Sequence, residues 1–587
     1  MDFERIPVTV VEIDQDRCCL SWKATNECGT CNADGDTPCY NTLATCQSEP
    51  DYTLGDPLTL RFSMRDRAES FDEYVMPSVD RVRTDPTRIN VGGRRGSSKP
   101  LGVRSQAKIR LIDHPHSDRL VDPYVDQRTF DPLERSTFWA KWLVRNPYYA
   151  NRPLRIREGY AGQALADMQT RHYIIDQIEG PGSGGSVSIV AQDILRLADN
   201  DKAKAPALTN GTLLTDYDEN STAAFVVTGG TLSEYTANNT DAVRIGDEVI
   251  RYSSITVLGN GDLRFNSPVR ATDGSERQSH DAEDTVQACL EYRNAQPWDV
   301  AYDLLVNFGG VPPVFVDLAA WEAESLQWLA SYPITRLLTE PEGVTKLLGE
   351  LSEQCLFYIW WDERDQEVRL KGIAPALDGV PLLTEQNDIL AGSVKIKVEP
   401  DERASEVWVN YLPRDATEDN DERKDFRRTR ARVDPTAASD IEYRERRVYE
   451  VFSQWLVNDV QTSLLALRLL SSFRDPPKYL SLELDVKDRS IGLSESIDIE
   501  YRGFVDENGL PKPVRYEVIS SHEPNNEGRV KIEAIQSIYG VGKNYARIAP
   551  NDVPVYSMAT EEQRDRYVFI ADNDNEMLNG DPPYLLI

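Results

Sequence analysis

Six of the eight cysteines fall within the first 46 residues, and their thiols are the side chains of this sequence best suited to holding a metal. They are Cys18, Cys19, Cys28, Cys31, Cys39 and Cys46, and only Cys289 and Cys355 follow in the rest of the chain. The segment that carries them is polar and too short to bury much apolar surface of its own. We therefore expect a covalent or coordinate link to hold it.

Three kinds of link compete. Disulfides would suit an even number of cysteines, but they belong to oxidising compartments, and the N-terminus has neither the basic nor the apolar region of a secretory signal. Zinc usually requires two closely spaced pairs, and only Cys28 and Cys31 have that spacing. An iron–sulfur cluster needs four thiolates and tolerates irregular spacing. The residues alone favour the cluster and leave the other two links open.

Composition narrows the class of protein. The 587 residues suffice for several domains, and 97 acidic against 65 basic residues give a formal net charge of -32. Such an acidic chain is repelled by nucleic-acid phosphates, so a DNA-gripping role is not expected. No apolar run approaches the roughly 18 residues of a membrane-spanning helix.

Alternating apolar residues predict a mainly β protein with α+β parts. Short strands are expected at 154–156, 368–370 and 394–398. Four more follow at close intervals, and they read as an antiparallel barrel or sandwich. Their apolar positions are Leu480, Leu482, Leu484 and Val486; Ile497, Ile499 and Tyr501; Val514, Tyr516 and Val518; and Val530, Ile532 and Ala534.

Helices are fewer. Asp131 followed by a proline predicts a helix start, with the helix running to 146, and further helices are expected at 297–308, 344–356 and 454–473. Residues 205–290, rich in Thr, Asn, Asp and Gly, form a candidate insert. The very polar stretch 414–432 is interpreted as a long surface loop.

Catalytic motifs are absent from the sequence: it contains no zinc-protease, nucleophile-elbow, Walker or Rossmann pattern. His114 and His116 flank a proline, which favours a turn over a metal site. The glycine-rich stretch at 90–98 reads as a hairpin loop, and Asp362 with Glu363 as part of a turn between strands. The residues thus predict a non-enzymatic, multi-domain protein with one metal-cluster module.

Several stretches resemble tail-tip (baseplate) hub proteins of long-tailed phages and gene-transfer-agent-like particles. They include C-C-L-S-W and C-Y-N-T-L-A-T-C-Q near the N-terminus, P-T-R-I-N-V-G-G, L-G-V-R-S-Q-A-K-I-R-L-I-D-H-P-H-S-D, D-P-Y-V-D-Q-R-T-F-D-P-L-E-R-S-T-F-W, F-Y-I-W-W-D-E-R and the closing M-L-N-G-D-P-P-Y-L-L-I. The similarity runs through most of the chain. The insert resembles a small β domain that recurs in phage tail proteins.

The resemblance implies a homotrimeric structural hub at the distal end of a tail, in the virion. Two β-barrels per chain would give a ring of six that matches the six-fold tube, with three-fold tip proteins below. The implied partners are a distal tail protein and the tail tube above and a central fibre or tip proteins below. Genome DNA would pass through an acidic channel without specific binding.

The resemblance also implies a cofactor, an iron–sulfur cluster of the 4Fe-4S kind. Cys18, Cys28, Cys39 and Cys46 sit where its four ligands are expected, with Cys19 and Cys31 as spare candidates. No catalytic residues are implied. Cys289 and Cys355 stand in apolar surroundings and are expected to be buried core thiols.

Six consecutive parts follow from this reading. They are an iron–sulfur module (1–50), a first hub barrel with a helix near 131–146 (51–204), the small β insert (205–290), an α+β domain (291–380), a second hub barrel with a long helix near 454–473 (381–544) and a C-terminal docking segment (545–587). The alternative functions are an iron–sulfur redox enzyme or a tail-associated cell-wall hydrolase. The first lacks a fingerprint for a second cofactor, and the second lacks a zinc triad.

Overall fold

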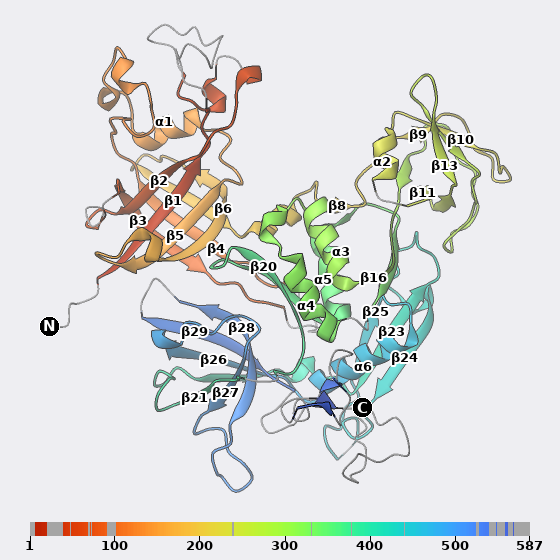
Figure 1. The fold of residues 1–587 in the computed structure, drawn as a ribbon. Helices are drawn as coiled ribbons and strands as arrows, with labels where there is room; N and C mark the ends of the chain where they lie inside the picture. The colour runs from red at the N-terminus through yellow and green to blue at the C-terminus, as the bar shows by residue number, and fades with distance from the viewer. Residues whose placement is uncertain are drawn as a thin grey trace.

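The computed structural model describes most of the chain as a mainly β protein built from several sheets (Figure 1). The described residues are 6–19, 39–46, 49–67, 71, 73–90, 101–237, 240–329, 332–376, 379–439, 441–523, 528–538, 547–548, 554, 558–560 and 567–568. Cys28, Cys31 and the glycine-rich stretch from residue 91 onward lie outside them, as does most of the expected C-terminal docking segment. No helix within the described ranges is long and apolar enough to cross a membrane.

The first expected barrel is a closed barrel, but its first strand lies at 7–15, within the range predicted for the iron–sulfur module and ahead of the predicted 51–204. Its strand order is β1-β2-β3-β4-β7-β6-β5, and β5 pairs with β1 to complete the ring. Alternate residues of neighbouring strands are buried, as in the pairs Ile109–Ile189 and Leu111–Val187. The strands are β1 (Pro7–Gln15), β2 (Leu58–Met64), β3 (Met76–Asp85), β4 (Gln106–Ile112), β5 (Pro153–Tyr160), β6 (Gln169–Glu179) and β7 (Ser186–Gln192).

Helix α1 (Phe138–Arg145) supplies aromatic side chains to the barrel core. Phe138, Trp139 and Trp142 are buried, and the Trp142 indole donates to Gln15 Oε1 at the end of β1 (2.9 Å). The helix is shorter than the predicted 131–146, because it begins only at Phe138. Asp131 does cap a turn, but only a 3-10 turn (Pro132–Glu134), and the chain turns through positive φ at Ser136 before α1 begins.

The second expected barrel is a half-barrel. Its six strands, in the order β21-β27-β28-β29-β26-β22, form a sheet whose ends do not meet in the described part of the chain. The predicted alternation holds, because one face of the sheet builds a separate core, although Val486 begins a 3-10 turn. The strands are β21 (Leu382–Thr384), β22 (Lys395–Val398), β26 (Lys478–Asp485), β27 (Ser496–Glu500), β28 (Val514–His522) and β29 (Arg529–Gln536).

The small β domain has two sheets around its own aromatic core, in which the rings of Phe225 and Phe265 stack 5.0 Å apart. One sheet has the order β13-β14-β10-β9 and the other β12-β11-β15. The elements are β9 (Thr212–Leu213), β10 (Phe225–Thr228), α2 (Leu232–Thr236), β11 (Ala242–Ile245), β12 (Glu248–Arg251), β13 (Ser254–Val257), β14 (Leu263–Asn266) and β15 (Val286–Ala288). All of them fall inside the range expected for the insert.

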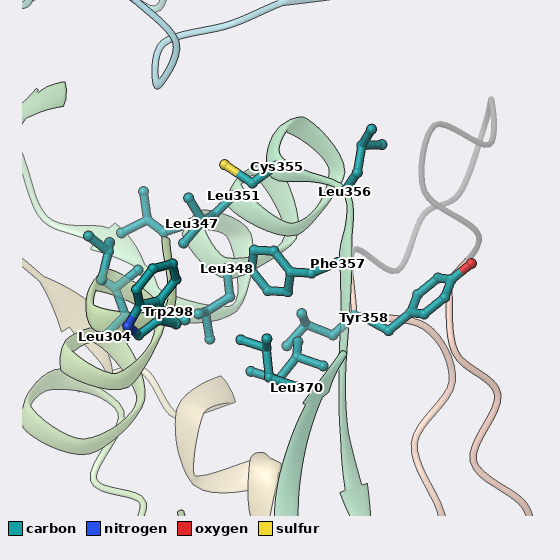
Figure 2. Packing of buried hydrophobic residues seen from close by; sticks show 14 of the residues in the cluster. Trp298, Leu304, Leu347, Leu348, Leu351, Cys355, Leu356, Phe357, Tyr358 and Leu370 are labelled. Carbon is teal, nitrogen blue, oxygen red and sulfur yellow. The ribbon is translucent and has the colours of Figure 1, made fainter. Parts of the chain in front are cut away.

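An α/β body joins these parts through the largest apolar cluster of the molecule. Figure 2 shows one region of it, where Leu347, Leu348 and Leu351 of α5 face Trp298 and Leu304 on one side and Phe357 on the other. Its elements are β8 (Lys204–Ala205), β16 (Leu290–Ala295), α3 (Pro297–Asp303), a π-helical turn (Leu304–Phe308), α4 (Leu318–Trp328), β17 (Ile334–Leu338), β18 (Glu342–Gly343), α5 (Val344–Cys355), β19 (Phe357–Asp362) and β20 (Glu367–Gly372).

Beside this body, helix α6 (Asp459–Phe473) packs on a three-stranded sheet of order β24-β23-β25, formed by β23 (Glu406–Pro413), β24 (Phe426–Val433) and β25 (Val448–Phe452). Strand β24 corrects the prediction of a surface loop at 414–432. It is an edge strand that carries arginines at four of its eight positions, so no apolar alternation announces it. Two short strands, β30 (Arg547–Ile548) and β31 (Tyr567–Val568), pair near the C-terminus.

The closed barrel and the half-barrel bond directly to each other. The Ile89 amide donates to the Ile519 carbonyl of β28 (3.0 Å), and the Ser520 hydroxyl donates to the Thr87 carbonyl (2.9 Å). The turn of the β19–β20 hairpin fits beside this junction (Figure 1). There the Trp361 indole donates to the His172 carbonyl (3.0 Å), and the His172 amide donates to the Glu363 carbonyl (2.8 Å).

Candidate functional site: a cysteine platform beside the closed barrel

Four of the six clustered cysteines lie in the described residues, and they gather where the chain leaves β1. Cys18 and Cys19 follow the strand, and their amides donate to the Asn41 and Thr53 carbonyls (2.8 and 2.9 Å). Cys46 ends a 3-10 turn (Leu43–Thr45). These backbone bonds bring three short segments together, and we call the described part of them, residues 17–19, 39–46 and 52–55, the cysteine platform.

A close approach within the platform requires a glycine. A Cβ atom at Gly55 would stand 2.8 Å from the Cβ of Cys19, closer than such atoms come in proteins. The Gly55 amide also donates to the Arg17 carbonyl (2.8 Å). The glycine thus lets the segment after residue 51 lie against the backbone of the cysteine pair.

The C-Y-N-T motif forms a tight corner. Asn41 has φ +56°, a left-handed conformation that asparagine tolerates better than most residues. Its side-chain oxygen accepts from the Tyr124 hydroxyl (2.7 Å), and the Cys39 sulfur lies 3.7 Å from the same oxygen. The corner therefore orients the buried Cys39 thiol.

The Cys39 thiol lies in the electrostatic field of two other cysteines. Burial raises its pKa, and the sulfur atoms of Cys46 and Cys18 act in the same direction, while Arg128 opposes them. Three of the four expected ligands, Cys18, Cys39 and Cys46, thus lie on the platform, and Cys28 lies outside the described residues. Within the described ranges no three His, Cys, Asp or Glu side chains are placed to hold a metal ion, and Cys18, Cys19 and Cys39 are free thiols.

Two arginines of the barrel's α1 side anchor the platform. Arg128 donates to the Cys39 carbonyl (2.6 Å) and pairs with the buried Asp122 (2.8 Å). The guanidinium groups of Arg128 and Arg145 lie 4.3 and 3.8 Å from the centre of the Tyr40 ring, a distance at which cations are attracted to aromatic faces. The platform is therefore docked by cation–π contacts and hydrogen bonds, with positive charge close to the thiols.

A second carboxylate, Asp118, supports the other arginine, Arg145. Asp118 pairs with Arg145 (2.9 Å) and Lys141 (2.7 Å). Burial opposes its ionisation, yet the Lys141 ammonium and the Arg145 guanidinium beside it lower its pKa to about 2. Asp118 therefore stays charged and holds Arg145 in place.

Sequence reasoning identified the cysteines but missed these supports. Asp122, Tyr124 and Arg128 all lie in D-P-Y-V-D-Q-R, a stretch noted only for its resemblance. His116 is a buried partner of Asp118, and its ring packs 5.1 Å from Phe138 at an edge-to-face angle. That agrees with the expected turn at His114 and His116.

The remaining residues singled out in the sequence lie away from the platform. Cys289 and Cys355 are fully buried, as expected for core thiols. Asp362 ends β19 and Glu363 follows in the hairpin turn, as predicted.

In comparisons with known proteins, similarity to this chain is found among solved structures. No protein-family model matches the chain, and no curated protein matches it. A tail protein from Neisseria meningitidis MC58 is similar at 11% identity and a TM-score of 0.36, over 78% of this chain and 92% of that one. The 43 kDa tail protein of prophage MuSo2 from Shewanella oneidensis matches at 8% identity and a TM-score of 0.34, over 78% and 98% of the two chains. The E. coli c3393 protein, a component of the type VI secretion system, matches at 7% identity and a TM-score of 0.32, over 82% and 79%. Scores this low carry no functional argument.

Proposed function

We propose that this protein is a structural, non-enzymatic tail hub that assembles as a homotrimer at the distal tip of a phage-like tail. The observation that carries the proposal is the pairing of a closed seven-stranded barrel with a six-stranded half-barrel in one chain, hydrogen-bonded to each other through residues 87–89, which follow β3, and β28. The sequence resemblance implies two barrels per chain, and the half-barrel occupies the part of the chain where the second barrel is expected.

Three copies would then present six barrel units to a six-fold tail tube and a distal tail protein. The same ring would offer three-fold symmetry to a central fibre or tip proteins below. Closed rings of identical chains are a common form of protein assembly. The half-barrel leaves β21 and β22 as sheet edges, and strand edges of this kind are available for pairing with a neighbouring chain.

Charge supports a passive channel for DNA. A net charge of -32 per chain becomes three times as large in the trimer, and an acidic lumen repels phosphates. Genome DNA would slide past without being held. The protein would reside in the virion, at the tail tip.

The cysteine platform would hold a 4Fe-4S cluster through Cys18, Cys39 and Cys46, with Cys28 as the fourth ligand and Cys19 and Cys31 as alternatives. The donor type suits the group, because soft thiolates are the ligands of such clusters, and the positive charge of Arg128 beside Cys39 offsets part of the rise in the thiol pKa that burial causes. The cluster would serve as a structural staple for a segment that lacks a core.

Oligomeric mass tests the hub. Sedimentation equilibrium of the full chain should give three times 66.3 kDa, and averaged electron micrographs should show a ring with six similar lobes. A chain that stays monomeric at every concentration, with no ring, would contradict the proposal.

Metal analysis tests the cluster separately. Anaerobically purified protein should contain about four irons and four sulfides per chain, with a broad absorption band near ~400 nm. Cys39→Ser should remove most of both, whereas Cys289→Ser, at a buried thiol of the small β domain, should retain them. Zinc in place of iron, or equal iron in both variants, would overturn the assignment.

A further inference from the structure

A cavity of about 610 Å³ lies where the closed barrel, the β19–β20 hairpin with α4, and the half-barrel meet. Its walls include Arg171 of β6, Trp321 of α4, Glu363 of the hairpin turn and Glu523 after β28. The volume is in the range of cavities that bind small ligands. We call it the junction cavity.

Glu523 is the unusual group in this wall. The residue is only 1% exposed, and both of its carboxylate oxygens are buried without a hydrogen-bond donor among the described residues. Burying a carboxylate without hydrogen bonds is costly. Glu523 therefore has unused capacity to accept hydrogen bonds from a cation.

Arg171 is a buried cation close to Glu523, but its hydrogen bonds and its ion pair go to other groups. Arg171 pairs with Glu158 (3.3 Å), donates to the Thr84 hydroxyl (3.2 Å), and donates to the backbone carbonyl of Glu523 rather than to its carboxylate (3.2 Å). Burial raises the pKa of both Glu158 and Glu363. The cluster thus holds more acid than Arg171 alone can neutralise.

The remaining cations of the wall are already engaged. Arg369 pairs with carboxylates of its own hairpin, the Arg364 guanidinium donates to the Arg489 carbonyl (2.9 Å), and the Lys371 ammonium donates to the Ser494 carbonyl (2.7 Å). Over the whole lining, seven carboxylates face four arginine and lysine side chains. Negative charge is therefore in excess around the cavity.

Two features indicate the kind of cation. No group of three His, Cys, Asp or Glu in the described ranges can hold a metal ion, which points away from a bare divalent metal. The tryptophans Trp321, Trp360 and Trp361 also line the cavity, and aromatic faces attract guanidinium and ammonium groups.

We propose that the junction cavity binds an organic cation, a guanidinium or primary ammonium group, with Glu523 as its main anionic partner. The group belongs either to a free polyamine or to an arginine or lysine side chain of another polypeptide. In both cases it supplies the donors that the Glu523 carboxylate lacks and joins the three parts that form the walls. The proposal does not rest on the hub function.

Calorimetric titration of the full-length protein at fixed ionic strength tests the proposal with two probes, spermidine and the blocked tripeptide acetyl-Gly-Arg-Gly-amide. We expect saturable binding of one molecule per chain for at least one probe. Spermidine alone would identify a free polyamine, the tripeptide alone a protein side chain, and both the shared chemistry. Mg²⁺ and an uncharged diol of spermidine's length should not saturate the site.

The variant Glu523→Gln keeps the size of the side chain and removes its charge. It should weaken binding at least tenfold, because hydrogen bonds between a cation and a carboxylate are stronger than those to a neutral amide oxygen. Glu219→Gln, which removes one exposed carboxylate from the small β domain, makes the same change in net charge and should leave affinity unchanged. If Glu523→Gln fails to fold, Glu363→Gln replaces it with the same expectation.

Binding of neither probe, or equal weakening by Glu523→Gln and Glu219→Gln, would overturn the proposal. So would Mg²⁺ saturating the same site with equal affinity, since the cavity would then select charge alone.

Discussion

Two clusters of buried glutamate and arginine side chains differ in how well their carboxylates are hydrogen-bonded. In the small β domain, the fully buried Glu248 accepts from Arg270 Nε (2.7 Å) and Nη2 (2.5 Å), from the amides of Ala271 and Gln278 (3.0 and 3.2 Å), and pairs with His280 (2.9 Å). At the junction cavity, both oxygens of Glu523 lack donors among the described residues. The first cluster is complete within its own domain, whereas the second is left open where three parts meet.

A structural cluster differs from a candidate binding site in the number of hydrogen-bond donors around its buried carboxylate. Burial of Glu248 would raise its pKa, yet hydrogen bonds from Arg270 and His280 lower it to about 2. Charge type and burial alone would not separate the two clusters. The number of donors around the carboxylate does.

The largest expected effect comes from Glu248→Gln. Neutralising the acid leaves the Arg270 guanidinium buried without its ion pair, so the small β domain should lose about 3–5 kcal/mol of stability. Hydrogen exchange of peptides covering β11 and β12 under increasing urea would measure the loss. Asp247→Asn, one residue away at an exposed ion pair with Arg244, should cost less than about 1 kcal/mol. Equal losses in the two variants would remove the distinction between a complete cluster and an exposed pair.

Changes in pH should act on the two regions in opposite directions. The folded pKa of Glu248 is about 2, below its usual 4.5, so its contribution to stability is present above pH 4.5 and is lost as pH falls toward 2. On the junction side of the closed barrel, burial raises the pKa of Asp193 from 3.8 to about 7. Its contribution is full below pH 3.8 and is lost as pH rises through 7.

Hydrogen exchange at several pH values would resolve the two trends. Protection of β12 should fall in acid, and protection around β7 should fall between pH 4 and 8. Asp193→Asn should abolish the second trend and leave the first. Parallel trends in both regions would show that net charge, and not these two groups, governs the response.

The smallest expected effect is that of Glu523→Gln on stability without ligand. Since its carboxylate has no hydrogen-bond donor to lose among the described residues, global stability should change by less than about 1 kcal/mol. Thermal unfolding of the variant beside the unsubstituted chain measures this. A loss as large as that of Glu248→Gln would mean that Glu523 is a full structural partner of Arg171, and the two clusters would then be alike.

Local patterns predicted β26, β27, β28 and β29 well, because each alternates apolar and polar residues against a one-sided core. They gave no sign of β21, and the apolar residues of β22 are exposed. They did not predict that the sheet stays open, since closure depends on which distant strands pair. Strand β24 escaped notice because the arginines at positions 427, 428, 430 and 432 leave no apolar period.

The two candidate sites also differ in whether the sequence alone could reveal them. The cysteine platform was visible because its ligands lie close together in sequence. The junction cavity was not, because Glu158, Arg171, Glu363 and Glu523 come from three separate parts of the chain. No pattern in the sequence joins them.

The β19–β20 hairpin has a mechanical consequence. Its turn is bonded to the closed barrel through His172 and, through Arg364, to the Arg489 carbonyl in the connection between β26 and β27 of the half-barrel. Strand β19 continues from α5 with a single left-handed residue, Leu356, between them. A rotation of one barrel against the other would therefore strain this hairpin together with the direct bonds between residues 87–89 and β28. Since only Leu356 separates β19 from α5, the relative orientation of the two barrels is coupled to the packing of that helix.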